Sequence, residues 1–179
     1  ARADFWNGHI PWCTPTDITA LNGYKYLAAT ERKISDSGLR ASSAELIPLK
    51  SVIMTSRATI GECAINTVSL ATSQGFKNFV PSSVDGEFLF YLMTTQKNHL
   101  VQLCGGSTFL EIGKKQLEQF EMYLPSDASE QRAVAKLLAD MDAEIDALER
   151  RRAKAHDLKV AMMQELLTGK TRLHGGELP

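Results

Sequence analysis

The stretch DASEQRAVAKLLADMDAEIDALERRRAKAHDLKVAMMQELLT, residues 127–168, decides the fold of this chain. It contains neither proline nor glycine, and it is dominated by alanine, leucine, lysine, arginine and glutamate, which are strong helix formers. Asp127 and Glu130 have the spacing of a capping box, and Gly169 follows where a helix commonly ends. The stretch therefore predicts one uninterrupted helix of about 40 residues and about 60 Å.

The apolar residues of this predicted helix recur alternately four and three positions apart, which is the heptad pattern of a coiled coil. The first half of this seam consists of Val134, Leu138, Met141, Ile145 and Leu148. Continued in register, the weaker second half includes Arg152, Met162 and Leu166. Because a period near 3.5 favours packing of helix against helix, we expect a second helix to cover the seam. The alternative is that the helix packs back on its own domain.

The preceding residues, 1–125, predict a mixed α+β globular domain. The β-branched apolar run at 51–55 and the alternating run at 63–72 each predict a strand, and residues 120–125 predict a short closing strand. Residues 85–104 predict a helix with Asp85 as its N-cap.

Residues 10–18, IPWCTPTDI, contain two prolines and a turn cluster, and they predict a loop. We expect three regions: a domain at 1–125, a long projecting C-terminal helix at 126–169 that pairs as an antiparallel coiled coil, and a tail at 170–179.

The composition is that of a chain able to bury a core, with 44% hydrophobic and 23% charged residues. The net charge of -1 does not predict a general polyanion binder, but it leaves DNA binding open because the distribution of charge decides. No apolar run approaches the roughly 20 residues that span a bilayer. No signal peptide is visible, so we expect a cytoplasmic protein without membrane contact. The chain begins at Ala1, which leaves open whether this is the natural start.

The sequence offers no convincing catalytic or metal site. Cys13, Cys63 and Cys104 lie far apart, and the four histidines are scattered, so no zinc site is expected. The stretch GGSTFLEIGKK, residues 105–115, does not have the spacing of a phosphate-binding loop. No nucleophile elbow and no glycine-rich cofactor fingerprint occur. The chain therefore predicts no catalytic residue and no cofactor, and it indicates a protein for binding or assembly.

Six segments, which follow one another over nearly the whole chain, carry a family resemblance. They are WNGHIPWCTPTDI (6–18), ISDSGLRASSAELIPLKSVIMTSRATIGECAIN (34–66), ATSQGFKNF (71–79), GSTFLEI (106–112), EQRAVAKLLADMDAEIDALE (130–149) and MMQELLTGKTRL (162–173). Together they resemble the specificity subunit of type I restriction-modification enzymes. Members of that family typically carry two recognition domains and two spacer helices, whereas this chain has one of each. Both a naturally short half-subunit and a fragment fit that difference.

The resemblance implies a non-catalytic subunit that reads one half of a split double-stranded DNA target in the major groove. In the family, methyltransferase subunits supply adenine methylation with S-adenosylmethionine, and a motor-nuclease subunit that uses ATP and Mg²⁺ cuts DNA. Paired antiparallel spacer helices set the gap between half-sites and dock the methyltransferase subunits. The resemblance thus implies a target recognition domain followed by a spacer helix, with no cofactor of its own.

Several polar residues are candidates for contact with DNA phosphates. Arg57 and Thr59 carry a guanidinium and a hydroxyl that can bond phosphate oxygens without reading sequence. Lys77 is a further candidate, and Ser107 and Thr108 follow two glycines in a stretch that could form a nest of backbone N–H groups. The alternatives are a framework turn with Arg57 paired internally and a turn that ends the preceding helix.

Reading of bases requires side chains that reach into the major groove. Gln74 can bridge an adenine edge, although an internal hydrogen bond is the alternative. The loop-rich segment before the first clear strand contains the other candidates, which are Lys25, Tyr26, Arg32, Lys33, Arg40, Ser42 and Ser43. For these residues the alternative is a solvated surface position. Trp6 and Trp12 can stack on bases or pack beneath a loop.

Two hypotheses for the whole chain follow. In the first, it is a half-subunit that forms a homodimer through antiparallel helices, in which Arg152 pairs with Glu144 or Glu149, and it reads DNA together with methyltransferase subunits. In the second, it is an assembly adaptor whose helix binds partner subunits and whose domain has no strong affinity for DNA.

Overall fold

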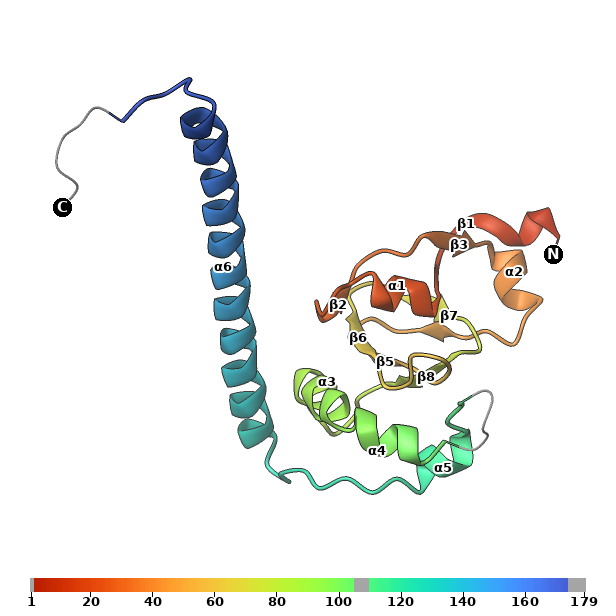
Figure 1. Cartoon of the computed structure of the whole chain (residues 1–179). Helices are drawn as coiled ribbons and strands as arrows, with labels where there is room; N and C mark the ends of the chain where they lie inside the picture. The colour runs from red at the N-terminus through yellow and green to blue at the C-terminus, as the bar shows by residue number, and fades with distance from the viewer. Residues whose placement is uncertain (1, 105–109, 174–179) are drawn as a thin grey trace. The chain divides into compact units, whose positions relative to one another are not determined.

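The computed structural model describes residues 2–104 and 110–173 of the chain. Its contacts divide the chain into two units, Ala1–Ala135 and Lys136–Pro179. A mixed domain is followed by a single long helix, as the sequence predicts, and the domain contains two sheets (Figure 1). The unit boundary lies inside this helix, so the first turns of the helix belong to the globular unit.

The two four-stranded sheets take their strands from different parts of the chain. In spatial order, sheet A contains β3 (Arg32–Ile34), β1 (Trp6–Cys13), β7 (Leu70–Thr72) and β4 (Leu46–Ile47). Sheet B contains β2 (Tyr26–Leu27), β6 (Cys63–Asn66), β5 (Val52–Thr55) and β8 (Phe76–Phe79). β1 runs parallel to β7 and β2 runs parallel to β6, and the other neighbouring strands are antiparallel.

The helices of the globular unit are short. They are the 3₁₀ turn η1 (Ala3–Phe5), α1 (Pro15–Thr19), α2 (Asp36–Arg40), α3 (Gly86–Thr95), α4 (Lys97–Gln102) and α5 (Lys114–Glu118). The long helix is α6 (Ala128–Leu167). None of the helices in the described ranges is both long enough and apolar enough to cross a membrane.

Two main cores lie on the two faces of sheet B because successive side chains of a strand point to opposite faces. Ile53 packs between the sheets with Cys13 and Leu70 of sheet A. Its neighbour Met54 packs on the other face with Met93 and Leu100 of the helices α3 and α4. All four residues of β5 are buried, so this strand forms the centre of the domain.

The predicted loop at 10–18 is wrong. Residues up to Cys13 belong to β1, and α1 begins at Pro15. Pro15 occupies the first turn of the helix, where backbone N–H groups have no partner within the helix, so the N–H that proline lacks is not needed there. Thr14 and Asp17 form a capping box in front of it, which is the helix-start signal in this turn-like stretch.

Two further strand predictions need correction. The single strand expected at 63–72 is two strands, β6 and β7, which lie in different sheets. The buried Asn66 amide donates to the carbonyl oxygens of Pro48 and Val68, each at 2.8 Å, and this holds the turn that separates the strands. The closing strand expected at 120–125 is absent from the described residues, because Phe120 and Met122 pack on the core without pairing their backbone in a sheet.

The helix predictions are confirmed, with one division. Asp85 caps α3 by accepting a hydrogen bond from the Phe88 N–H at 3.0 Å, but the chain turns at Gln96 and continues as α4. The long helix α6 matches the proline- and glycine-free stretch. The Asp127 carboxylate accepts a hydrogen bond from the Ser129 N–H at 2.8 Å, and Gly169 follows the helix with a left-handed φ of 73°.

The first turns of α6 are tied to the domain through Gln131, whose side chain is 2% exposed. Its Oε1 accepts from the Asp85 N–H at 2.8 Å, and its Nε2 donates to the Pro125 carbonyl oxygen at 2.7 Å. Ala135, one turn further on, is also buried. One amide therefore joins α6, the N-cap of α3 and the preceding linker.

Candidate nucleic-acid interface

The topology of sheet A places one terminus of each of its four strands at the same end of the sheet. β1 and β7 are parallel, so both end there, with Cys13 opposite Thr72. β3 and β4 are antiparallel to their neighbours, so both begin there, with Arg32 opposite Trp12 and Leu46 opposite Ala71. Loops at the ends of these strands bring together segments that are distant in the sequence.

A cleft of about 310 Å³ lies at this end of the sheet, and we call it the strand-end cleft. It is lined by Trp12, Ser42, Ser43, Ala44, Glu45, Ile47, Thr72, Ser73, Gln74 and Asn78. Three residues predicted to read bases, Ser42, Ser43 and Gln74, therefore line one cavity. Hydrogen bonds hold its frame, since the Ser73 N–H donates to the Cys13 carbonyl oxygen at 3.0 Å.

Several polar groups of the strand-end cleft are not used within the fold. Among the described residues, the side chains of Ser43, Glu45 and Gln74 have no hydrogen-bond or ion-pair partner. The Asn78 amide donates to the Thr72 hydroxyl at 2.9 Å, which leaves its buried Oδ1 without a donor in the described part of the chain. Ser42 is committed, because its hydroxyl donates to the Leu39 carbonyl oxygen at 3.1 Å.

Arg32 is an exposed and oriented cation on β3, and its strand neighbour Trp12 lines the cleft. Its guanidinium lies 3.7 Å from the centre of the Trp6 ring, and Trp6 meets Trp12 edge to face at 6.3 Å. Stacking on an indole restricts a guanidinium but leaves its N–H groups available to anions. Trp6 and Trp12 are both half-buried, so packing and exposure of an aromatic edge are combined here.

Lys25 and Tyr26 are occupied within the domain. Lys25 Nζ lies 2.7 Å from Glu87 Oε2 and donates to the Tyr91 hydroxyl at 3.0 Å, with its side chain 12% exposed. The Tyr26 hydroxyl donates to Glu87 Oε1 at 2.5 Å. Burial opposes the charge of Lys25, but the hydrogen bonds to Glu87 and Tyr91 outweigh it and raise the pKa of the ammonium group. These contacts link β2 to α3.

None of the predicted phosphate contacts in the described residues lines the strand-end cleft. Arg57 forms an ion pair with Glu111 at 2.9 Å, so the internal pairing considered as the alternative is present. The Thr59 hydroxyl oxygen is buried, and among the described residues it has no partner. Lys77 pairs with Met54 across the strands, which places it on the helix-covered face of sheet B. Ser107 and Thr108 lie outside the described residues.

Lys33 and Arg40 are exposed on β3 and at the end of α2. Lys33 follows Arg32 directly in the strand, so its side chain points to the opposite face. Glu45 and Asn78 were not among the predicted base-reading residues, whereas Trp12 was considered for stacking on bases. No local pattern marks Glu45 and Asn78, because they meet only through the pairing of β4 with β7 and the hydrogen bond of Asn78 to Thr72.

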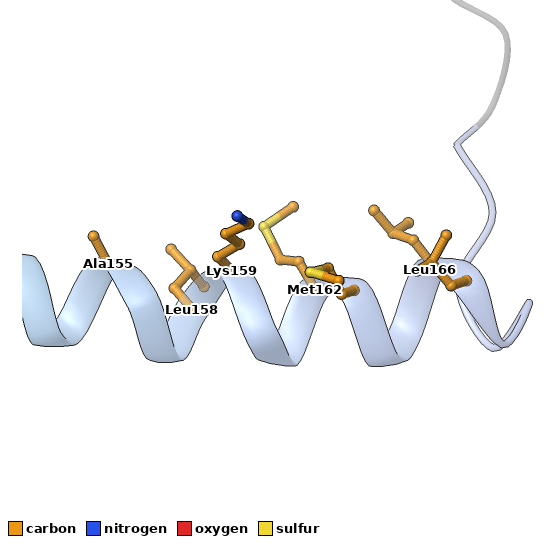
Figure 2. A pocket seen from close by; sticks show the side chains of 7 residues that line it. Ala155, Leu158, Lys159, Met162 and Leu166 are labelled. Carbon is orange, nitrogen blue, oxygen red and sulfur yellow. The ribbon is translucent and has the colours of Figure 1, made fainter.

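The predicted seam of α6 is largely uncovered in this chain. Val134, Leu138 and Leu166 are half-buried, Arg152 is exposed, and Met141, Ile145 and Leu148 are 53%, 54% and 56% exposed. Near the end of the helix, Leu158, Met162, Met163, Leu166 and Leu167 form an apolar surface with Ala155 and the stem of Lys159 (Figure 2). Exposed apolar stripes of this size on a helix indicate a partner surface.

The described residues contain no cluster of metal ligands, and two of the three cysteines are buried. Residues 2–104 and 110–173 contain no group of three histidine, cysteine, aspartate or glutamate side chains that could hold a metal ion. Burial raises the pKa of the Cys13 and Cys63 thiols to about 12, so the reactive thiolate is not formed near neutral pH.

Comparison with known proteins gives one consistent result. Residues 2–155 match the family model described as the type I restriction modification DNA specificity domain. The type I restriction enzyme MjaIX specificity subunit of Methanocaldococcus jannaschii is 37% identical over 142 residues, which cover 78% of this chain and 32% of the relative. A second relative from that organism, the putative MjaX specificity subunit, is 32% identical over 68% of this chain and 29% of its own length. The chain thus spans about a third of these relatives.

Solved structures show the same fold at low sequence identity. A structure described as the basis of complex assembly and conformational transition of the type I R-M system matches with a TM-score of 0.71 and 19% identity, over 92% of this chain and 40% of that one. The HsdS subunit from Thermoanaerobacter tengcongensis matches with a TM-score of 0.59 and 15% identity, over the same shares of the two chains. At these identities the likeness concerns the fold.

Proposed function

The chain belongs to the type I restriction modification DNA specificity domain family, and on that premise we propose that it reads one half of a split DNA target in the major groove. Its family is one of recognition rather than catalysis. The observation that carries the proposal is the strand-end cleft, which is lined by uncommitted polar side chains, together with the oriented cation of Arg32 on the far edge strand of the same sheet. Direct reading of sequence requires such free donors and acceptors.

Phosphate contact and base contact are assigned to different residues in this proposal. Arg32 on β3 and the exposed Arg40 at the end of α2 supply positive charge for phosphates, which positions the domain on the duplex, whereas Lys33 points to the opposite face of β3 and takes no part. Ser43 and Gln74 face base edges from the cleft. Lys25 and Arg57 take no part, because Glu87 and Glu111 already neutralise them.

The helix α6 pairs with a second α6 in an antiparallel arrangement and sets the distance between two half-sites. The half-exposed Met141, Ile145 and Leu148 support this, since each apolar side chain removed from water contributes about 1.5–3 kcal/mol. Antiparallel pairing brings Arg152 near Glu144 or Glu149 of the other copy. A two-fold arrangement predicts a palindromic split target.

The partners follow from the same proposal. Methyltransferase subunits dock on α6 and supply the methylation chemistry with S-adenosylmethionine, and the motor-nuclease subunit joins through that complex with ATP and Mg²⁺. The apolar surface around Met162 and Leu166 supports a docking role for the end of the helix.

A second candidate function is that of an assembly adaptor without strong DNA affinity. The net charge of -1 and the internal pairing of Lys25 and Arg57 favour it. A salt titration of DNA binding separates the two functions, because phosphate contacts give a steep loss of affinity with salt and an adaptor gives no slope that depends on Arg32.

The proposed function is tested by mapping adenine methylation. The chain is reconstituted with the methyltransferase subunits of its system and S-adenosylmethionine, and random-sequence DNA is sequenced for methylated positions. We expect a single motif with two inverted halves and a fixed gap. Methylation without a common motif, or none that depends on this chain, would contradict DNA reading.

A further inference from the structure

The polar lining of the strand-end cleft has a definite chemical character. The Glu45 carboxylate is an acceptor, and the buried Asn78 Oδ1 is a second acceptor without a donor in the described part of the chain. Ser43 and Gln74 each add a group that can donate or accept. Among the described residues that line the cleft there is no lysine or arginine. A carboxylate without a neighbouring cation repels phosphate, so the ligand of this cleft is not the DNA backbone.

Base edges differ in the one property that Glu45 tests. In the major groove adenine N6 and cytosine N4 are donors, whereas guanine and thymine present oxygen acceptors. A carboxylate therefore attracts the first two bases and repels the other two. On the premise of the function proposed above, we propose that Glu45 accepts a hydrogen bond from the exocyclic amino group of one adenine or cytosine and so determines one position of the target.

The position of Glu45 suits this role. It directly precedes β4, whose residue Leu46 pairs with Ala71, so the sheet fixes its backbone while its exposed side chain has no partner in the described residues. β4 is an edge strand of sheet A, so a duplex can approach from its open side. A rigid backbone with a free terminal group is the arrangement that reads a base with little loss of entropy.

Arg32 stands at the opposite edge strand of the same sheet. Three strand spacings separate β3 from β4, which amounts to about 14 Å. The major groove is about 12 Å wide, so one domain can place Arg32 at a phosphate and Glu45 at a base edge inside the groove. The two charges of opposite sign then have different ligands.

The test compares the methylation motifs of the wild type, E45Q, E45K and the control E121Q in the reconstituted complex. Glu121 is exposed and lies on the linker after α5, between two residues that pack on the helix-covered core. We expect the wild type and E121Q to share one motif with a position restricted to adenine or cytosine. In E45Q the side-chain amide can donate as well as accept, so the preference for adenine or cytosine at that position should fall about tenfold or more. E45K presents only donors and should shift the preferred base towards guanine.

The affinity for DNA that lacks the motif gives a second readout, which should rise in the same variants in which discrimination between bases falls. Removal of a negative charge should strengthen this non-specific binding in E45Q and more so in E45K, while discrimination falls. If Glu45 had only a structural role, its substitution would weaken both the non-specific binding and the discrimination between bases. An unchanged motif in E45Q and E45K would overturn the role of Glu45 but leave DNA reading in place. Absence of any motif in the wild type would overturn the proposed function itself.

Discussion

The globular unit and the long helix differ in how far their apolar side chains are buried. In the domain, Ile53, Met54 and Leu70 are fully buried between layers of the same chain. Along α6, Ile145 and Leu148 stay more than half exposed. A helix gains most of its stability in a protein from packing of its apolar face, so the exposed seam of α6 is the reason for the pairing proposed above, whereas the domain already has its own core.

The largest expected effect is on assembly, and it comes from a change in the exposed seam of α6. I145D places a charge in the seam of both copies, so two buried side chains are lost and the dimer weakens by about 3–6 kcal/mol. Light scattering over a range of concentrations measures this as a shift from dimer to monomer. The exposed E121Q variant is the control, and a wild-type chain that stays monomeric at tens of micromolar contradicts the pairing.

The second effect concerns the domain alone. M93A removes a fully buried side chain next to Leu100 and leaves a cavity, which should lower the free energy of unfolding by about 2–5 kcal/mol. Thermal or urea unfolding of the domain measures it. M141A on the exposed seam is the matched control and should change domain unfolding by no more than about 0.5 kcal/mol. Equal losses in both variants would mean that the helix seam belongs to the domain core.

A smaller effect sharpens the boundary between the two regions. Q131L keeps the side-chain volume but leaves the Asp85 N–H and the Pro125 carbonyl oxygen without their partner, which should destabilise the domain by about 1–3 kcal/mol. Hydrogen exchange at the start of α6 and at the N-terminus of α3 should rise together. Faster exchange confined to α6 would show that Gln131 does not connect the two helices.

The smallest effect separates two arginines of the domain. R32A should reduce the slope of log affinity against log salt by about 1, because one phosphate contact is lost. R57A should leave that slope unchanged and cost about 0–1 kcal/mol of stability, since Arg57 is held by Glu111 in a partly exposed pair. The reverse result would assign the phosphate contact to Arg57.

Local features of the sequence were enough for the long helix α6, for the start of α3 and for the family. The stretch without proline and glycine predicts α6 nearly to the residue, and Asp85 marks the start of α3. Strands were predicted less well. The run at 63–72 spans two strands that belong to different sheets, and the prolines near Cys13 concealed β1 and α1.

The candidate site shows the same division. Ser42, Ser43 and Gln74 were predicted as single residues from their side-chain chemistry, and their meeting in one cleft was not. Glu45 and Asn78 carried no signal, and Arg57 was predicted as a phosphate contact because the sequence does not reveal that Glu111 reaches it.

The sequence by itself determined the length and seam of α6 and the membership of its family, because helical hydrogen bonds join residues four positions apart and heptads can be read directly. Only the tertiary structure decided which polar side chains are free and which share a cleft. Strand pairing joins residues that are far apart in the chain, as Trp12 with Ala71, so the position of Glu45 beside Gln74 depends on a sheet that no local pattern specifies.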